Sequence, residues 1–194
     1  MDKQSVIDFF NGAAADWDAR LVHNDAKINR ILDYAGICAG QRVLDVGCGT
    51  GVLVPDYLAR SVAEVVGVDI SPRMIEAAQG KFDDPRVRFV CADVETAALG
   101  APFDRVVVYN AFPHFPDPDA LAEALAARLA DGGRLTIAHG MSRARIDAHH
   151  SGPANAVSRG LMAAEDLAAV LAARFTVDVI VSDDDIYVVS GVKQ

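Results

Sequence analysis

The sequence lacks the features that mark several classes of protein. Its 18 lysines and arginines stand against 27 aspartates and glutamates, which gives a formal net charge of -9. This shortage of basic residues disfavours nucleic acid as a partner, because phosphate binding requires clustered Lys and Arg. No apolar run approaches the roughly 20 residues of a membrane span, and the first residues lack the charged and apolar regions of a secretory signal. We therefore expect no nucleic-acid partner and no membrane association.

Cysteine and aromatic residues are also scarce. The three cysteines show no framework spacing, which excludes a disulfide-stapled fold and suits a reducing cytoplasm. Aromatic residues make up 7% of the chain and include one tryptophan. Apolar residues are abundant at 52%, with 23% charged, as in a globular protein with a sizeable core. We expect one cytoplasmic domain over residues 1–194, with an N-terminal helical segment at 1–40 and a sheet core at 41–194.

The strongest pattern in the chain is VLDVGCGTG at residues 43–51. Its apolar residues predict a buried parallel strand, and its three glycines predict a tight turn that lets the main chain approach a ligand. A helix is expected at 52–60, so the turn follows the first strand of an open α/β sheet, where ligands bind. The dinucleotide fingerprint spaces its glycines differently, and the Asp45 carboxylate would repel a pyrophosphate but suit an ammonium group. We interpret Cys48, which no basic residue flanks, as a small filler of the turn.

Strands and helices alternate along the rest of the chain. One helix is predicted to start at Pro72, after the N-cap residue Ser71. The other helices are predicted at 5–10, 25–37, 117–130 and 163–174. The other strands are predicted at 64–69, 86–91, 103–109, 134–139, 175–181 and 186–192. The short link at 182–185 permits only an antiparallel pair, so the βα units end in a hairpin. Residues 141–159 show no clear period.

The D-x-G-x-G-x-G run at 45–51, placed between a strand and a helix, closely resembles motif I of the class I S-adenosylmethionine (SAM)-dependent methyltransferases. The closing hairpin resembles the same family, in which the last strand inserts between the fifth and the sixth. The resemblance covers nearly the whole chain. It implies a Rossmann-like α/β fold, with a mostly parallel seven-stranded sheet, one antiparallel strand and helices on both faces. It also implies direct in-line transfer of a methyl group from SAM to a small-molecule acceptor, giving S-adenosylhomocysteine (SAH).

Residues that follow the strands match cofactor-binding positions of this family. Asp69 ends the second strand and matches an acid that accepts hydrogen bonds from ribose hydroxyls. Asp93 and Val94 match the adenine-edge position, and Asn110 ends the fourth strand. The segment around Trp17 resembles the N-terminal lid of small-molecule methyltransferases. The implied cofactor-binding set is Asp45, Gly47, Cys48, Gly49, Gly51, Asp69, Ile70, Met74, Asp93, Val94, Asn110 and Trp17.

Histidine is the natural group to take a proton from a methyl acceptor. His114 follows the fourth strand and His139 ends the fifth, so we expect one of them to act as a base or to position the acceptor. His149 and His150 lie in the loop beyond, and His23 precedes the helix that leads into the first strand. A metal site built from several of these imidazoles is an alternative that no ligand spacing enforces. Adjacent histidines in a strand would point to opposite faces.

Several alternatives stay open. The chain could be a SAM-binding sensor or partner protein without activity, or a nicotinamide-dependent oxidoreductase, which the glycine spacing and closing hairpin disfavour. Arg143 and Arg145 either grip a carboxylate or phosphate on the acceptor or are solvated loop charges. The stretch YNAFPHF at 109–115 departs from the Asn-Pro-Pro-aromatic pattern of DNA base methylation, which disfavours a nucleic-acid substrate. The acceptor, the atom methylated and the oligomeric state are unassigned.

Overall fold

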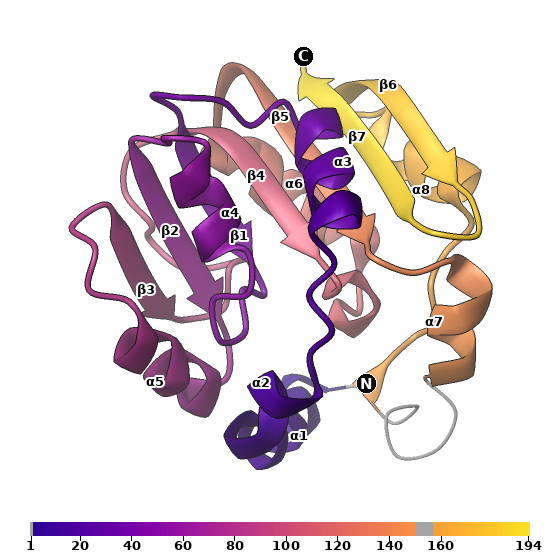
Figure 1. Ribbon diagram of the computed structural model, residues 1–194. Coiled ribbons are helices and arrows are strands. Elements are labelled where there is room, and N and C mark those ends of the chain that lie inside the picture. Colours follow the sequence, from indigo (N-terminus) through magenta and orange to yellow (C-terminus); the bar gives the residue numbers. More distant parts are fainter. Residues whose placement is uncertain (1, 150–156) are drawn as a thin grey trace.

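The centre of the protein is a seven-stranded sheet with the order β3-β2-β1-β4-β5-β7-β6 (Figure 1). The computed structural model describes residues 2–149 and 157–194. Strands β1 to β5 run parallel, whereas β7 is antiparallel to both of its neighbours. The expected insertion of the last strand between the fifth and sixth is therefore confirmed. The strands are β1 (Arg42–Val46), β2 (Glu64–Asp69), β3 (Val87–Cys91), β4 (Phe103–Tyr109), β5 (Leu129–His139), β6 (Phe175–Ser182) and β7 (Tyr187–Lys193).

Helices cover both faces of the sheet, as expected. Ile28 and Tyr57 bring α3 and α4 onto one face, and Leu125 and Leu167 bring α6 and α8 onto the other. The central strands contribute fully buried side chains to both layers, which explains why their sequences are continuous apolar runs. The helical segments are α1 (Lys3–Ala13), η1 (Ala14–Asp16), α2 (Trp17–Arg20), α3 (Asp25–Tyr34), α4 (Val54–Ala59), α5 (Pro72–Lys81), η2 (Phe112–His114), α6 (Pro118–Arg128), α7 (Arg143–His149) and α8 (Ala164–Leu171).

Local sequence signals account for several helix ends. Ser71 caps α5, with its Oγ accepting a hydrogen bond from the Met74 N–H at 3.2 Å, and Pro72 follows as predicted. Several predicted boundaries differ from the observed ones: α1 is longer than the predicted 5–10, α3 and α8 end before the predicted 37 and 174, and β5 begins before the predicted 134. The helix predicted to run to residue 130 ends at Arg128, because Leu129 already pairs with Phe103 ahead of a bulge in β5. The segment predicted without a period contains α7, whose seven residues are too few to show one.

The N-terminal helices lie apart from the sheet layers. Figure 1 shows α1 and α2 beyond the arrowheads of β1, β2 and β4, with an extended link leading back to α3 on the sheet. They therefore cover the carboxyl ends of the parallel strands, the edge where open α/β sheets bind their ligands. None of the helices in the described ranges is long and apolar enough to cross a membrane.

Candidate active site

A cavity opens between the carboxyl ends of β1 to β4 and the N-terminal helices. It spans about 1050 Å³ of space between side chains, which includes space open to solvent. Every predicted cofactor-binding residue except Gly51 lines it. The lining also includes side chains that the sequence did not single out, most of them apolar: Lys3, Val6, Phe10, Leu21, Val46, Val52, Leu53, Val68, Ala92, Tyr109, Ala111, Phe115 and Pro116.

The glycine turn forms the floor of the cavity. Gly47 and Gly49 have φ angles of 66° and 54°, which favour glycine, and a Cβ on Gly47 would lie 2.6 Å from the Cβ of Ala111. The turn is bound to β2, because the Gly47 and Cys48 N–H groups donate to the Val68 carbonyl at 2.8 and 3.1 Å. The main chain can therefore pass close to a ligand without side chains in the way.

Gly51 has a different role from the other two glycines. A Cβ at this position would lie 2.7 Å from a ring carbon of Phe82 and 3.2 Å from Phe89, so the glycine allows the turn to pack against those rings. Cys48 is buried beside it, and burial raises the pKa of its thiol well above the usual value. This environment suits the predicted filler role for Cys48.

Three carboxylates stand at the tips of β1, β2 and β3. Burial raises the pKa of Asp45 to about 7, and the negative charge of Asp69 adds to the shift. Burial also raises the pKa of Asp69, although that carboxylate accepts hydrogen bonds from the N–H groups of Gly49 at 2.9 Å and Ser71 at 2.8 Å. Asp93 accepts a hydrogen bond from the Glu95 N–H at 3.0 Å. The cavity wall is therefore acidic and suits a cationic ligand.

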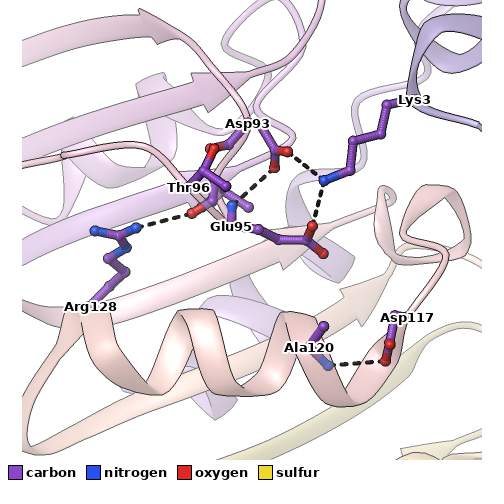
Figure 2. Close-up of polar contacts among 8 residues, drawn as sticks. Lys3, Asp93, Glu95, Thr96, Asp117, Ala120 and Arg128 are labelled. Atoms are coloured by element: carbon purple, nitrogen blue, oxygen red, sulfur yellow. Dashed lines mark hydrogen bonds and ion pairs between the residues drawn. The ribbon is translucent and has the colours of Figure 1, made fainter.

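The first helix reaches this acidic wall through Lys3. Its ammonium group binds both Asp93 and Glu95, the latter at 2.5 Å (Figure 2). Burial lowers the pKa of Lys3, but the hydrogen bonds that its ammonium group donates to Asp93 and Glu95 together outweigh burial, so the pKa is raised. No local sequence pattern indicates this contact, because its partners lie 90 and 92 residues away.

Two further contacts fix the N-terminal helices to the cofactor loops. The Asn11 side-chain oxygen accepts a hydrogen bond from the Ser71 hydroxyl at 2.8 Å, at the start of α5. The Asp18 carboxylate accepts a hydrogen bond from the Thr50 hydroxyl at 2.5 Å and binds Lys81 at 2.8 Å. The N-terminal helices thus contact each of the loops that follow β1, β2 and β3.

The sequence of the chain matches a known family. A family profile described as a methyltransferase domain matches residues 43–133. Malonyl-[acyl-carrier protein] O-methyltransferase from Acetivibrio thermocellus is 33% identical over 140 residues, which are 71% of this chain and 50% of that protein. Ubiquinone biosynthesis O-methyltransferase from Xylella fastidiosa is 38% identical over 146 residues, which are 70% of this chain and 58% of that protein. The chain belongs to the class I SAM-dependent methyltransferase family.

Solved methyltransferases share the fold. The N-methyltransferase NodS from Bradyrhizobium japonicum, in complex with SAH, matches with a TM-score of 0.75 and 17% identity. The match covers 97% of this chain and 98% of that one. By contrast, the chain spans about half the length of the two curated relatives, 50% of the Acetivibrio protein and 58% of the Xylella protein.

Among the histidines whose side chains the structure describes, His114 is the one that lines the cavity. It lies in η2, directly after β4, and its ring stands edge-on to Phe10 at 4.9 Å. Its Nδ1 lies 2.6 Å from the Val157 carbonyl oxygen, so Nδ1 carries the proton and donates. In that tautomer the ring lone pair is on Nε2.

The other histidines are placed differently. His139 is buried at the end of β5, where its ring packs against Tyr187 at 5.8 Å, outside the cavity lining. His23 lies 3.4 Å from Asp56, on the link between α2 and α3. His149 ends α7, and its side chain is outside the described part of the structure, as is the whole of His150.

The structure lends no support to the metal alternative. Within the described residues, no group of three or more His, Cys, Asp and Glu side chains could hold a metal ion. Arg143 and Arg145 are exposed on α7 and do not line the cavity, and the Arg143 Nε donates to the Leu161 carbonyl at 2.9 Å.

Asn110 connects the ends of β4 and β5. It has a φ angle of 53°, which is uncommon for a residue other than glycine. Its N–H donates to the Ala138 carbonyl at 2.9 Å, and its side-chain oxygen accepts from the Gly140 N–H at 3.0 Å. These contacts fix the start of the loop that carries His114 against the end of β5.

Proposed function

We propose that this protein transfers a methyl group from SAM to a small-molecule acceptor and releases SAH. One observation carries the proposal: an acidic cavity with a glycine floor lies at the carboxyl ends of β1 to β4, in a chain of the methyltransferase family. The family match leaves the nicotinamide-dependent alternative without support.

The residues of the cavity fit SAM. Its sulfonium and ammonium groups are cationic, and the wall offers Asp45, Asp69 and Asp93. Each Asp69 carboxylate oxygen accepts a hydrogen bond from one main-chain N–H group, and these bonds orient the carboxylate. Each oxygen keeps a further lone pair that can accept a hydrogen bond from a ribose hydroxyl. Ile70 and Met74 line the same side and supply apolar surface for the adenine.

The bound cofactor supplies an activated methyl group. The chain therefore needs to position the acceptor, enclose the reacting groups away from water and take a proton from the acceptor. Phe10 and Leu21 reach the cavity from the N-terminal segment, and their covering position excludes water. Asn110 fixes the loop after β4, which sets the direction from which an acceptor approaches. His114 takes the acceptor's proton on Nε2, since Nδ1–H is committed to the Val157 carbonyl.

The surroundings of His114 favour an uncharged acceptor. Phe10, Phe115 and Pro116 line the cavity near it. Both relatives named above are O-methyltransferases by name, which supports an oxygen acceptor here. His139 is not part of this proposal, because it lies outside the cavity lining.

The deciding experiment measures conversion of SAM to SAH over a panel of phenols, enols, amines, thiols and carboxylic acids. The wild-type protein is expected to turn over at least one hydroxyl acceptor. With that acceptor, His114→Gln is expected to lower kcat by about 10²- to 10⁴-fold, the usual contribution of a general base. Its affinity for SAH, measured by calorimetry, should stay within about threefold, a change below 1 kcal/mol.

A matched control is His139→Gln, which changes the same residue type outside the cavity and is expected to keep kcat. Wild-type protein that binds SAH tightly but converts no acceptor would instead favour a SAM-binding sensor. Folded protein that binds neither SAM nor SAH would contradict the proposal.

We also propose a cytoplasmic location. Cys38, Cys48 and Cys91 are all free thiols, which a reducing compartment preserves. Fractionation of cells that make the protein tests this proposal, and recovery in an oxidising compartment would contradict it.

A further inference from the structure

A short segment far along the chain supports the loop that carries His114. Residues 157–159, which we call the brace, lie between α7 and α8. Val157 is buried at one end of the brace, and Leu161, just beyond its other end, belongs to the main core cluster. The brace therefore has a fixed position relative to the core, and it can hold a neighbouring loop in place.

Three hydrogen bonds join the brace to this loop. The Arg159 N–H donates to the Pro113 carbonyl at 3.0 Å, and the Arg159 Nη1 donates to the Pro116 carbonyl at 3.0 Å. His114 makes the third bond, from its Nδ1 to the Val157 carbonyl at 2.6 Å. The two proline carbonyls lie before and after His114 in the sequence. The brace therefore holds the main chain on both sides of the histidine as well as the ring itself.

The His114 ring depends on the brace for its protonation pattern. Within the loop, the His114 N–H donates to the Ala111 carbonyl at 3.0 Å, which fixes the main chain of the turn but not the ring. In a neutral histidine, the hydrogen bond made by one ring nitrogen decides which of the two carries the proton. The Val157 carbonyl can only accept, so its place opposite Nδ1 puts the proton on Nδ1 and the lone pair on Nε2.

We propose that Arg159 is a positioning residue for His114. By joining the brace to the loop on either side of the histidine, it keeps the Val157 carbonyl opposite Nδ1, so that Nε2 keeps the lone pair. Arg159 is exposed and is not part of the cavity lining, so it acts through His114 and not on a ligand. The catalytic consequence rests on the proposed function, in which Nε2 takes the acceptor's proton.

The first test needs no acceptor. Nuclear magnetic resonance of protein with isotopically labelled histidine reports which ring nitrogen is protonated, and the signal that disappears in His114→Gln belongs to His114. At about pH 8, where an ordinary histidine is neutral, wild-type His114 is expected to carry its proton on Nδ1. In Arg159→Gln the ratio of this tautomer to the other should fall by about three- to tenfold, the size of one hydrogen bond.

The second test uses the hydroxyl acceptor that the panel identifies. Arg159→Gln is expected to lower kcat by about three- to tenfold and to leave the Kd for SAH within about twofold of wild type. Arg159→Lys keeps a cationic donor and should recover part of the loss. In a His114→Gln background, the Arg159→Gln change should have no further effect on kcat, because no imidazole is left to position.

Arg88→Gln is the matched control, because the Arg88 guanidinium also donates to a main-chain carbonyl, that of Leu99 at 3.1 Å, but on the edge strand β3. It should change neither the tautomer ratio nor kcat. An unchanged ratio in Arg159→Gln, or a kcat loss of the same size in both backgrounds, would overturn the assignment. A wild-type protein that binds SAH and shows the tautomer change in Arg159→Gln, but converts no acceptor, would contradict the proposed function alone. Melting curves establish that each variant is folded.

Discussion

At the scale of single residues, the burial of the Asp45 carboxyl has a cost in stability. Asp45 is 2% exposed, and burial, followed by the charge of Asp69, raises the pKa of its carboxyl to about 7. An aspartate in an unfolded chain titrates near about 3.9. Between these two values the folded state holds a proton that the unfolded state releases, so stability falls as pH rises from about 4 to about 7.

We predict that Asp45→Asn removes this pH-dependent loss. At about pH 8 the variant should unfold at a higher urea concentration than wild type, and at about pH 4 the difference should shrink, because wild-type Asp45 is then protonated. Asp131→Asn, which removes an exposed carboxylate instead, is the control variant. A parallel loss of SAH affinity in Asp45→Asn is expected, since the ammonium loses its partner. Equal stability of variant and wild type across this range would contradict the pKa of Asp45.

The titration of Asp45 should also change the affinity of the protein for SAH. Wild-type affinity for SAH is expected to rise between about pH 6 and about pH 8, as Asp45 gains its charge. Asp45→Asn should lose most of this dependence. Calorimetric titrations across the range measure it, and a wild-type Kd that does not change with pH would argue against an ionised Asp45 as the ammonium partner.

At the scale of elements, the N-terminal segment behaves as a cover fixed at three points. Lys3, Asn11 and Asp18 contact the loops after β3, β2 and β1. A ligand that leaves the cavity would have to pass this N-terminal segment. Weakening one of the three contacts should therefore raise the rate of ligand dissociation more than it lowers the stability of the fold.

We predict that Lys3→Met increases the rate of SAH dissociation by about two- to fivefold, as expected for a partly exposed ion pair. The effect should be larger at low salt, because exposed pairs are screened. Lys27→Met is the matched control, since Lys27 pairs with Asp185 at 2.8 Å on a loop that does not line the cavity. Stopped-flow displacement measures the rates. Identical rates in Lys3→Met and wild type at low salt would show that this contact does not hold the cover.

The N-terminal segment also shows which parts of the site could be predicted from the sequence and which could not. The strand tips carrying Asp45, Asp69 and Asp93 were predictable, because a parallel sheet brings its carboxyl ends to one edge. It was not predictable that Lys3 and Phe10 line the cavity, because contacts between distant segments produce no periodic pattern in the local sequence. Similarly, α7 was missed because its sequence, RARIDAH, contains one large apolar residue, Ile146, which sets no pattern over seven residues.

At the scale of the whole molecule, β7 completes the sheet by fitting between β5 and β6. Tyr187, Val188 and Val189 are fully buried there. Tyr187 and Val189 belong to the core cluster that includes Val46 and Val68 of the cavity lining, whereas Val188 belongs to the cluster that contains Ile31 of α3. The position of β7 was predictable only from the family resemblance, since the short link at 182–185 fixes an antiparallel pair but not its place in the sheet.

The fit of β7 is tight at Gly191. An added Cβ would lie 2.9 Å from the Thr176 carbonyl oxygen and 3.1 Å from the Phe175 Cβ. We predict that Gly191→Ala lowers the free energy of unfolding by about 1–3 kcal/mol, the cost of overpacking a core. Gly80→Ala, in α5 with nothing within 4 Å of an added Cβ, should leave stability equal or raise it slightly. Urea denaturation compares the two, and a Gly191→Ala variant as stable as wild type would show that β6 and β7 can separate locally.

The chain's one tryptophan faces the cavity, against the glycine turn. Selective excitation of indole therefore gives an optical signal from the cover and from nowhere else in the protein. Ligand arrival should change the colour and intensity of that emission, and shield it from a soluble quencher. The molecule thus contains its own unlabelled fluorescent probe, with which candidate ligands can be screened before any acceptor is known.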